Sequence, residues 1–454
     1  MFGQYRSQSD SLDKAAEQLR SQLSSLPQLL KLCIITQFYP PDYAATGQLV
    51  EDLAKNLGQF NIAVEVFTGQ PGYAFDQTSA PTVEKTERLV VKRSPIARFW
   101  LNRIRGKATG GLLFCCHAVF YLLRHAHRHS VLLVTTAPPF LPLLGYLAQR
   151  CLGLPYVCLL YDLYPDIAIA SQVIPAHHWL ARYWRRINHK VWQRAQTIIV
   201  MSPAMKQRIV DYHPDLATKV SVIHNWADPE RIVPIPKNRN WFAWKHDLVE
   251  PFTVLYSGNM GRCHDLETVI SAAAYLRNKP ICFVFIGGGA QRQQCLEQAQ
   301  VLGLTNCLFL PYQAREALPY SLTACDLSLI SIRSGFEGLV APSKLYSSLA
   351  AGRPVAVISE KNSYLGQLVK KTGCGAVFEP GSAKALAKFI HYLSLDVSAA
   401  EQMGKRGRSC FEKRFTPAIV TKLYASIFLK VASLKEAVPS SLVCNRLERG
   451  KNLK

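Results

Sequence analysis

Residues 334–346 contain the side chains best suited to bind an anion. Pro342 and Ser343 are residue types that begin helices, so Lys344 is expected in the first turn of a helix. The N-terminal end of a helix carries partial positive charge and disfavours a cation, unless an anion is bound beside it. Lys344 therefore predicts a phosphate-binding site, with a solvated surface lysine as the plainer alternative.

A second candidate anion site follows the expected strand at residues 252–257. Gly258 and Asn259 open a loop that contains Arg262 and leads into an expected helix at residues 266–276. Backbone N–H groups at such a turn, together with an arginine, can hold a diphosphate. The glycines at 287–289 do not fit the spacing of a dinucleotide-binding loop, which disfavours an NAD site.

The first half of the chain offers two weaker candidates. Asp162 and Asp166 stand at the end of an expected strand and could orient a polyhydroxyl substrate. The alternative is that either aspartate caps the next helix or neutralises a nearby arginine. Gly47 opens a helix after another strand and allows close approach of a phosphate or sugar, although small residues at such a turn more often reflect plain turn chemistry.

Short apolar segments alternate with helical segments along most of the chain, which predicts an α/β fold with doubly wound parallel sheets. In such sheets ligands bind beyond the carboxyl ends of the strands, where the candidate residues lie. The expected strands are 32–36, 63–68, 131–135, 156–161, 197–201 and 220–224 in the first half, and 252–257, 282–286, 307–310, 327–331, 354–358 and 376–378 in the second.

A chain of 454 residues is long enough for two such domains facing a central cleft. The predicted divisions are an N-terminal helical extension (1–30), a first Rossmann-like domain (31–233), a linker (234–251), a second Rossmann-like domain (252–415), a helix that crosses back (416–435) and a disordered tail (436–454).

The formal net charge is +22, and it is concentrated in the first half. Seventeen lysines and arginines lie between Glu87 and Asp211, together with only two acids. A basic face of this kind attracts anionic lipid headgroups, nucleic acid or a pyrophosphate-bearing substrate, and charge alone does not distinguish these.

Two apolar segments bear on membrane contact. Residues 110–123 are too short to span a bilayer but are flanked by arginines, which favours a helix lying on the membrane surface. Residues 131–149 contain three prolines and fit a strand, a loop and a new helix better than a span. Residues 1–30 lack the apolar core of a signal peptide, and the thirteen cysteines show no metal-ligand spacing, so a reducing compartment is expected.

In the order and spacing of its motifs, the sequence resembles family 4 of the retaining glycosyltransferases, which have the GT-B fold. The likeness covers residues 31–434 and is greatest to members that act in exopolysaccharide, colanic acid or O-antigen synthesis. The motifs that carry it are 37–41 (QFYPP), 162–166 (DLYPD), 222–225 (VIHN), 256–259 (YSGN), 342–344 (PSK) and 350–354 (AAGRP).

The resemblance implies a nucleotide-sugar site in the second domain and an acceptor site in the first. The implied catalytic residues are Asp162, facing the transferred sugar or the acceptor, with Arg262 and Lys344 at the diphosphate. The implied donor-binding residues are Gly47, in a loop closing from the first domain; Gly258, Asn259, Arg262, Ser343 and Lys344, at the phosphates; Tyr312 and Gln313, near the base; and Glu337 and Ser347, where family members carry paired glutamates.

The expected reaction is transfer of a hexosyl group from a nucleotide-diphosphate sugar to a lipid-linked or saccharide acceptor, in cell-surface polysaccharide synthesis. Helix N-termini and two cations would stabilise the leaving diphosphate, and no DxD-type metal motif occurs in the sequence, so neither a metal nor a cofactor is expected. Retention of configuration follows from the resemblance alone. The protein is expected in the cytoplasm, peripherally on the inner face of the cell membrane, with an anionic membrane surface as a partner.

Two alternatives stay open. A nucleotide-sugar epimerase could use the same fold, and product analysis without an acceptor would distinguish it. A basic nucleic-acid-binding protein would fit the charge, but the sequence has no recognised binding module and no interleaved aromatic and basic pattern, so nucleic acid is not an expected partner.

Overall fold

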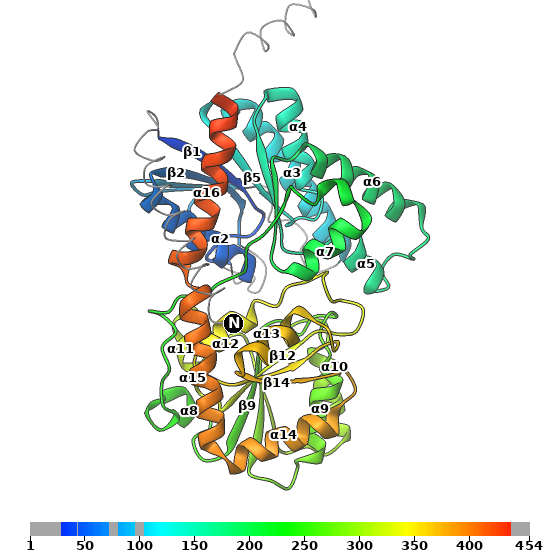
Figure 1. The fold of residues 1–454 in the computed structure, drawn as a ribbon, viewed down its shortest axis with the longest axis vertical. Helices are drawn as coiled ribbons and strands as arrows, with labels where there is room; N and C mark the ends of the chain where they lie inside the picture. The colour runs from blue at the N-terminus through cyan, green and yellow to red at the C-terminus, as the bar shows by residue number, and fades with distance from the viewer. Residues whose placement is uncertain (1–28, 43, 72–79, 96–103, 437–454) are drawn as a thin grey trace, which may run out of the picture.

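The structure, a computed structural model, describes residues 29–42, 44–71, 80–95 and 104–436. These residues form two α/β domains stacked along the long axis of the molecule (Figure 1). The expected α/β fold with two mainly parallel sheets is confirmed. The predicted helical extension at 1–30 and the predicted tail at 436–454 fall almost entirely outside the described residues.

The first domain contains an eight-stranded sheet in the order β3-β4-β2-β1-β5-β6-β7-β8. Its central strands are apolar on both faces, as in β5, where every residue is buried, because helices cover both sides of a parallel sheet. The strands are β1 Leu30–Ile35, β2 Ile62–Gly69, β3 Val83–Lys85, β4 Leu89–Ser94, β5 Val131–Thr135, β6 Tyr156–Leu160, β7 Thr197–Val200 and β8 Val220–Val222.

The second domain contains a six-stranded, entirely parallel sheet in the order β11-β10-β9-β12-β13-β14. All six strands lie within one or two residues of the expected ones. They are β9 Phe252–Ser257, β10 Ile281–Ile286, β11 Cys307–Leu310, β12 Leu327–Ser331, β13 Val355–Ile358 and β14 Gly375–Phe378.

The sequence did not predict β3 and β4. β3 is antiparallel to β4 at the sheet edge, and β4 in turn pairs in parallel with β2. β3 is largely exposed and β4 carries Lys92 and Arg93, so neither segment has the continuous apolar run of a buried strand.

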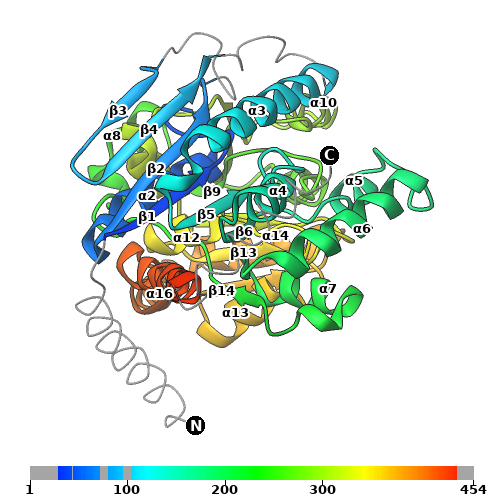
Figure 2. The ribbon, with the colours of Figure 1, turned by 90° about the horizontal axis from the view of Figure 1, so that it is seen from above.

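The helices flank both sheets, and Figure 2 shows α3 and α16 on opposite sides of the first sheet. The first-domain helices are α2 Ala45–Leu57, α3 Ile104–His125, α4 Pro142–Leu152, α5 Asp166–Ala170, α6 Trp179–Arg194 and α7 Pro203–Tyr212. Those that follow are α8 Trp241–Lys245, α9 Glu267–Tyr275, α10 Arg292–Val301, α11 Leu318–Thr323, α12 Lys344–Ala350, α13 Tyr364–Thr372, α14 Ala383–Leu395, α15 Val397–Arg414 and α16 Pro417–Glu436.

The two C-terminal helices lie on different domains (Figure 1). α15 packs on α12 and α14 of the second domain, whereas α16 packs on α2, β1 and β5 of the first. Tyr424 and Phe428 of α16 are fully buried there. The chain therefore ties the domains together twice, once through residues 223–251 and once through α16.

Within the described residues, one helical stretch, Val397–Leu434, is long and apolar enough to cross a membrane. It comprises α15 and α16, whose apolar side chains Phe411, Tyr424 and Phe428 are buried inside the protein. Of the most apolar 18-residue window in this stretch, 44% is buried inside the protein. Residues 131–149 divide into β5, a turn and α4.

Candidate active site

A loop after β9, residues 258–265, lies near the first domain, since the charge of Asp162 acts on its Cys263. Its backbone is fixed from the neighbouring strand ends: the Met260 N–H donates to the Gly288 carbonyl at 2.6 Å, and the Arg333 N–H donates to the Cys263 carbonyl at 2.8 Å. The Gln291 side chain donates to the Gly261 carbonyl and, at 2.9 Å, to the His264 carbonyl. The loop is therefore held in place by backbone contacts before any ligand binds.

Lys344, the first residue of α12, extends its side chain onto this loop. Its Nζ donates to the Asn259 carbonyl at 3.3 Å and to His264 Nε2 at 3.4 Å. The same ammonium group lies 4.9 Å from the centroid of the Tyr256 ring. The structure thus joins the two predicted anion sites, although they are about 80 residues apart in the sequence.

His264 is a neutral hydrogen-bond acceptor for this lysine. Its Nδ1 lies 2.6 Å from the Ser331 carbonyl, which can only accept, so the ring proton is on Nδ1 and Nε2 faces Lys344. Burial and, secondly, the charge of Lys344 lower the pKa of His264 to about 3. The imidazole therefore adds no positive charge at neutral pH.

The Lys344 ammonium is poorly compensated. Burial lowers its pKa to about 8, no carboxylate pairs with it in the part of the chain described, and one of its three N–H donors has no protein partner there. A half-buried cation at the start of a helix opposes the helix dipole, and an anion beside it removes that conflict. The arrangement suits a bound phosphate.

Gly258 makes the approach of Lys344 possible. Its φ is +119°, and a Cβ atom there would lie 3.0 Å from Lys344 Cε. Any other residue would strain the backbone and push the lysine side chain away from the loop.

Asp162 approaches the same loop from the first domain. It forms an isolated antiparallel bridge with Val340, and the adjacent Leu163 N–H donates to the Leu339 carbonyl at 3.1 Å. Burial raises the pKa of Asp162 to about 6. Its negative charge also acts on Cys263, which follows Arg262 in the loop. The structure therefore brings Asp162 close to the segment that leads into Lys344.

Gly47 lies in the first turn of α2, and α2 is on the side of the first domain that faces the second (Figure 1). A Cβ atom at this position would lie 3.0 Å from the Phe38 and Tyr39 backbone, so the glycine lets the helix start pack against that segment. One turn later α2 touches the second domain, where Arg315 Nη1 lies 2.6 Å from Glu51 Oε2.

The remaining predicted donor residues line the second domain with fewer contacts. The Arg262 side chain is exposed and forms no ion pair or hydrogen bond with the rest of the described chain. The Tyr312 hydroxyl lies 3.5 Å from the Gly288 carbonyl, and the Gln313 amide donates to the Pro311 carbonyl at 2.8 Å. Ser343 precedes α12 without capping it by its side chain, and the Ser347 hydroxyl donates to the Lys344 carbonyl at 3.0 Å.

Glu337, which was expected at the donor ribose, makes its protein contact with the start of α13. Its Oε1 accepts from the Tyr364 N–H at 3.0 Å, at the start of α13. Oε2 is buried without a hydrogen-bond partner among the described residues, and burial raises the pKa of this carboxyl group. One oxygen of Glu337 is thus occupied, and one remains for a ligand.

Sequence reasoning missed Tyr256 and Gln291. The Tyr256 ring carries the Lys344 ammonium, and its hydroxyl donates to the Asn259 carbonyl at 2.9 Å, while Gln291 fixes the loop. Tyr256 lies in the 256–259 motif but nothing local gave it a role, and no motif contains Gln291, because the contacts of both residues are made only in the fold.

One group within the described chain has metal-ligating side chains close together: His189, His213 and Asp215. His189 Nε2 is 3.1 Å from Asp215 Oδ2, and the two imidazole rings stack at 4.1 Å. These residues lie on and after α6 and α7, not on the 258–265 loop, so they do not enter the donor site.

Comparisons with known proteins match both halves of the chain. Residues 45–226 match the family model "Glycosyl transferase 4-like domain", and residues 239–409 match "Glycosyl transferases group 1". The probable glycosyltransferase WbjE of Pseudomonas aeruginosa is 28% identical over 317 residues, which is 67% of this chain and 76% of WbjE. The putative colanic acid biosynthesis glycosyl transferase WcaI of Escherichia coli K12 is 39% identical over 138 residues, covering 30% and 34%.

Solved structures share the fold at low sequence identity. The sucrose-phosphate synthase of Thermosynechococcus elongatus superposes with a TM-score of 0.73 at 16% identity, over 89% of this chain and all of that one. HepE of Anabaena, solved with UDP and glucose, gives 0.65 at 16% identity, over 87% and 98%. These matches confirm the GT-B architecture expected from the motifs, and the chain belongs to the family 4 glycosyltransferases of the GT-B fold.

Proposed function

We propose that this glycosyltransferase moves a hexosyl group from a nucleotide-diphosphate sugar to a lipid-linked or saccharide acceptor in cell-surface polysaccharide synthesis. The observation that carries the proposal is the half-buried Lys344 ammonium, which lies against the 258–265 loop without a carboxylate partner among the described residues. The names of WbjE and WcaI support the polysaccharide context. The HepE complexes, which contain UDP and UDP-glucose, make UDP the first nucleotide to test.

In the proposed reaction, negative charge grows on the diphosphate as the sugar–oxygen bond breaks. Lys344 and the exposed Arg262 supply positive charge from two sides of the 258–265 loop, and stabilisation of a developing charge in a dry site lowers the barrier. We propose that these cations do the work that a divalent metal performs in other transferases. Activity that is retained in excess EDTA supports this proposal, and loss restored by Mg²⁺ contradicts it.

Asp162 is the proposed polar group facing the reacting sugar or the acceptor hydroxyl. Its pKa of about 6 keeps it ionised at neutral pH, so it could accept a hydrogen bond from a hydroxyl group. We propose retention of configuration, which rests on the family resemblance. NMR of the anomeric proton in the first-formed product tests it, and an inverted anomer would contradict it.

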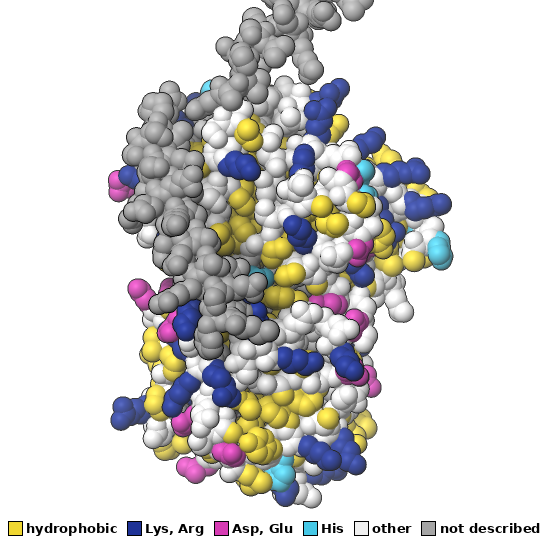
Figure 3. All heavy atoms as spheres, viewed as in Figure 1, with side chains coloured by type: hydrophobic (Ala, Val, Ile, Leu, Met, Phe, Trp, Pro, Cys, Tyr) yellow, Lys and Arg dark blue, Asp and Glu magenta, His cyan; other side chains and the backbone are white. Residues whose placement is uncertain are grey.

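The proposed location is the inner face of the cell membrane. Exposed apolar side chains of α3 (Leu112, Phe120 and Leu123) and of α6 (Trp179 and Tyr183) occur on the first domain, and α4 packs between the two helices. Lysine and arginine side chains gather over α4 and α6 in Figure 3. Apolar and basic groups on one surface fit an anionic bilayer.

Vesicle co-sedimentation tests the membrane proposal. We expect binding to phosphatidylglycerol vesicles, weak binding to phosphatidylcholine vesicles, and weaker binding in both Phe120→Ser and Trp179→Ser. Equal binding to the two vesicle types, or none to either, would contradict a peripheral location.

A thermal-shift screen with UDP, GDP and ADP tests the donor site. The bound nucleotide raises the melting temperature by mass action, and the largest shift identifies the base. No shift with any nucleoside diphosphate at millimolar concentration would contradict the proposed donor class.

A further inference from the structure

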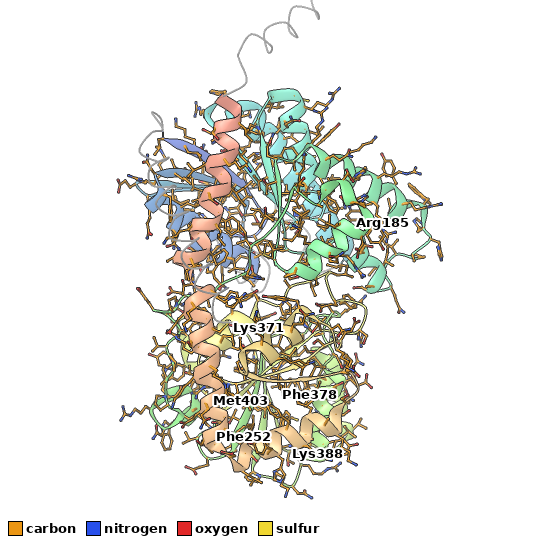
Figure 4. All side chains as sticks on the ribbon, in the orientation of Figure 1. Arg185, Phe252, Lys371, Phe378, Lys388 and Met403 are labelled. Carbon is orange, nitrogen blue, oxygen red and sulfur yellow. The ribbon has the colours of Figure 1, made fainter. Side chains whose placement is uncertain are left out.

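A pocket in the first domain has no role in donor binding. It lies between α6, α7 and the segment Leu163–Asp166 that follows β6, and it holds about 340 Å³ of empty space including its open mouth. Figure 4 labels Arg185, which comes from α6 on this flank of the domain. The pocket combines two arginines with aromatic side chains.

The two arginines keep unused hydrogen-bond donors in buried positions. Arg185 forms an ion pair with Asp166, Nη2 to Oδ1 at 2.5 Å, which fixes the guanidinium, and its Nε is buried without a partner. Arg208 of α7 forms no hydrogen bond or ion pair within the described chain, and its Nε is buried without a partner as well. The terminal N–H groups of Arg208, a half-buried residue in the pocket lining, have no partner in the described chain, so they are the donors available to a ligand with several acceptor oxygens.

Aromatic rings form the walls beside these donors. Tyr164 stacks on Trp184 with ring centroids 5.9 Å apart, and Arg185 lies 5.3 Å from the Tyr212 centroid. Trp192 completes the lining. The pocket therefore suits a ligand that is anionic at one end and apolar or ring-shaped at the other.

The pocket adjoins the second domain. Leu163, in its lining, hydrogen-bonds to Leu339, and a side chain at Gly338 would collide with the backbone of Ala204 in α7. The charge of Arg208 also acts on Glu337. A ligand in this pocket would thus lie next to the segment that leads to Lys344.

Away from the segment that leads to Lys344, the pocket continues toward the exposed part of α6. Trp179 and Tyr183 are 64% and 56% exposed, and the exposed basic residues of this helix are Arg182, Arg186, Lys190 and Arg194. An acyl or prenyl chain in a bilayer against this helix would place its headgroup at the pocket.

We propose that the pocket holds the diphosphate of a lipid-linked acceptor, with Arg185 and Arg208 as its ligands. The inference rests on the proposed function, because it specifies the acceptor of the same reaction. The aromatic walls contact the first sugar or the first part of the lipid chain, and the acceptor hydroxyl points toward Asp162.

The test is isothermal titration with three probes: farnesyl diphosphate, inorganic pyrophosphate and farnesol. Saturating UDP occupies the donor site, so the probes report only the acceptor side. UDP binding itself is measured first. Its absence would count against the proposed function alone, and the three probes are then titrated without UDP, so the pocket is tested in either case. In the presence of UDP, we expect farnesyl diphosphate to bind at least tenfold more tightly than either of the other probes.

The pocket is assigned by four variants. Arg208→Gln and Arg185→Gln should each weaken farnesyl diphosphate binding by about tenfold or more, because each removes charge-assisted hydrogen bonds. Arg208→Lys, which keeps the charge but not the guanidinium donors, should give an intermediate loss. Arg186→Gln, an exposed arginine one residue beyond Arg185, is the matched control and should bind within twofold of wild type. Melting temperatures verify that each variant is folded.

Three results would overturn the proposal. Equal affinity for pyrophosphate and farnesyl diphosphate would mean a site for a free anion, and equal affinity for farnesol would mean an apolar groove. A loss in Arg186→Gln as large as in Arg208→Gln would mean unspecific attraction to the basic surface.

Discussion

The candidate donor site of the second domain and the pocket of the first domain differ in the kind of group that forms them. In the second domain, the 258–265 loop is held by backbone hydrogen bonds and by a glycine that only just admits Lys344. In the first domain, the pocket beside Asp162 is formed by long aromatic and basic side chains with unused donors. A donor site of the first kind is rigid and tolerates little change, whereas a site of the second kind can change its ligand through single side chains.

The largest expected effect is at the donor site of the second domain, where Lys344 lies against the 258–265 loop. Lys344→Ala removes a cation from the leaving diphosphate and should lower turnover by about a hundredfold to a thousandfold in a donor-hydrolysis assay. The fold should persist, because the half-buried ammonium opposes the helix dipole and has no carboxylate partner among the described residues. The exposed Lys384→Ala is the control and should have wild-type rates. Wild-type rates in Lys344→Ala would contradict the proposal that this lysine stabilises the leaving diphosphate.

A substitution at Gly258 tests whether the 258–265 loop tolerates a side chain beside Lys344. Gly258→Ala should destabilise the protein by about 1–3 kcal/mol through backbone strain, and should weaken UDP binding by displacing Lys344. Gly303→Ala, at a φ of +62° with open space around it, is the matched control. It should cost stability by denaturant unfolding yet leave the UDP affinity unchanged. Equal UDP affinity in Gly258→Ala and wild type would show that the close approach is unimportant.

In the first domain, Asp162→Asn should lower the rate of transfer by about tenfold, since a charged hydrogen-bond acceptor is lost. The carboxylate is present above its pKa of about 6, so wild-type kcat/KM should fall as the pH drops below 6. This acid limb should be missing from the variant. Glu401→Gln, at an exposed ion pair, should keep it. An unchanged acid limb in Asp162→Asn would assign that limb to another group.

The smallest effect concerns the pH dependence of donor binding. The ammonium form of Lys344 binds the diphosphate, so UDP affinity should be constant below pH 8 and fall by up to about tenfold per pH unit above it. Stability of the free protein should move in the other direction: the folded-state pKa is lowered, so deprotonation between about pH 8 and 10.5 relieves the burial penalty. A flat UDP affinity up to pH 10 would contradict a role for this titration.

Much of this arrangement could be predicted from the sequence. The buried strands β5, β9 and β12 are mainly apolar, and their ends coincide with the expected positions. The edge strand β3 and its neighbour β4 lack that signal, because β3 is largely exposed and β4 carries Lys92 and Arg93. The two anion-binding segments could each be recognised from local helix and turn chemistry.

The contacts between distant segments could not be predicted. Lys344 meets Asn259 and His264 only because β9 and β12 are neighbours in the sheet. The pairing of Arg185 with Asp166, and the isolation of Arg208, depend on how α6 and α7 pack. Sequence therefore predicted which residues could bind anions, and the fold decides which of them act together.

The most direct measurement is a crystal structure of the protein with UDP. The diphosphate is expected within hydrogen-bonding distance of Lys344 Nζ and of the backbone around Gly258, with the exposed Arg262 side chain turned toward it. A diphosphate bound elsewhere, with Lys344 keeping only its contacts to Asn259 and His264, would contradict the account.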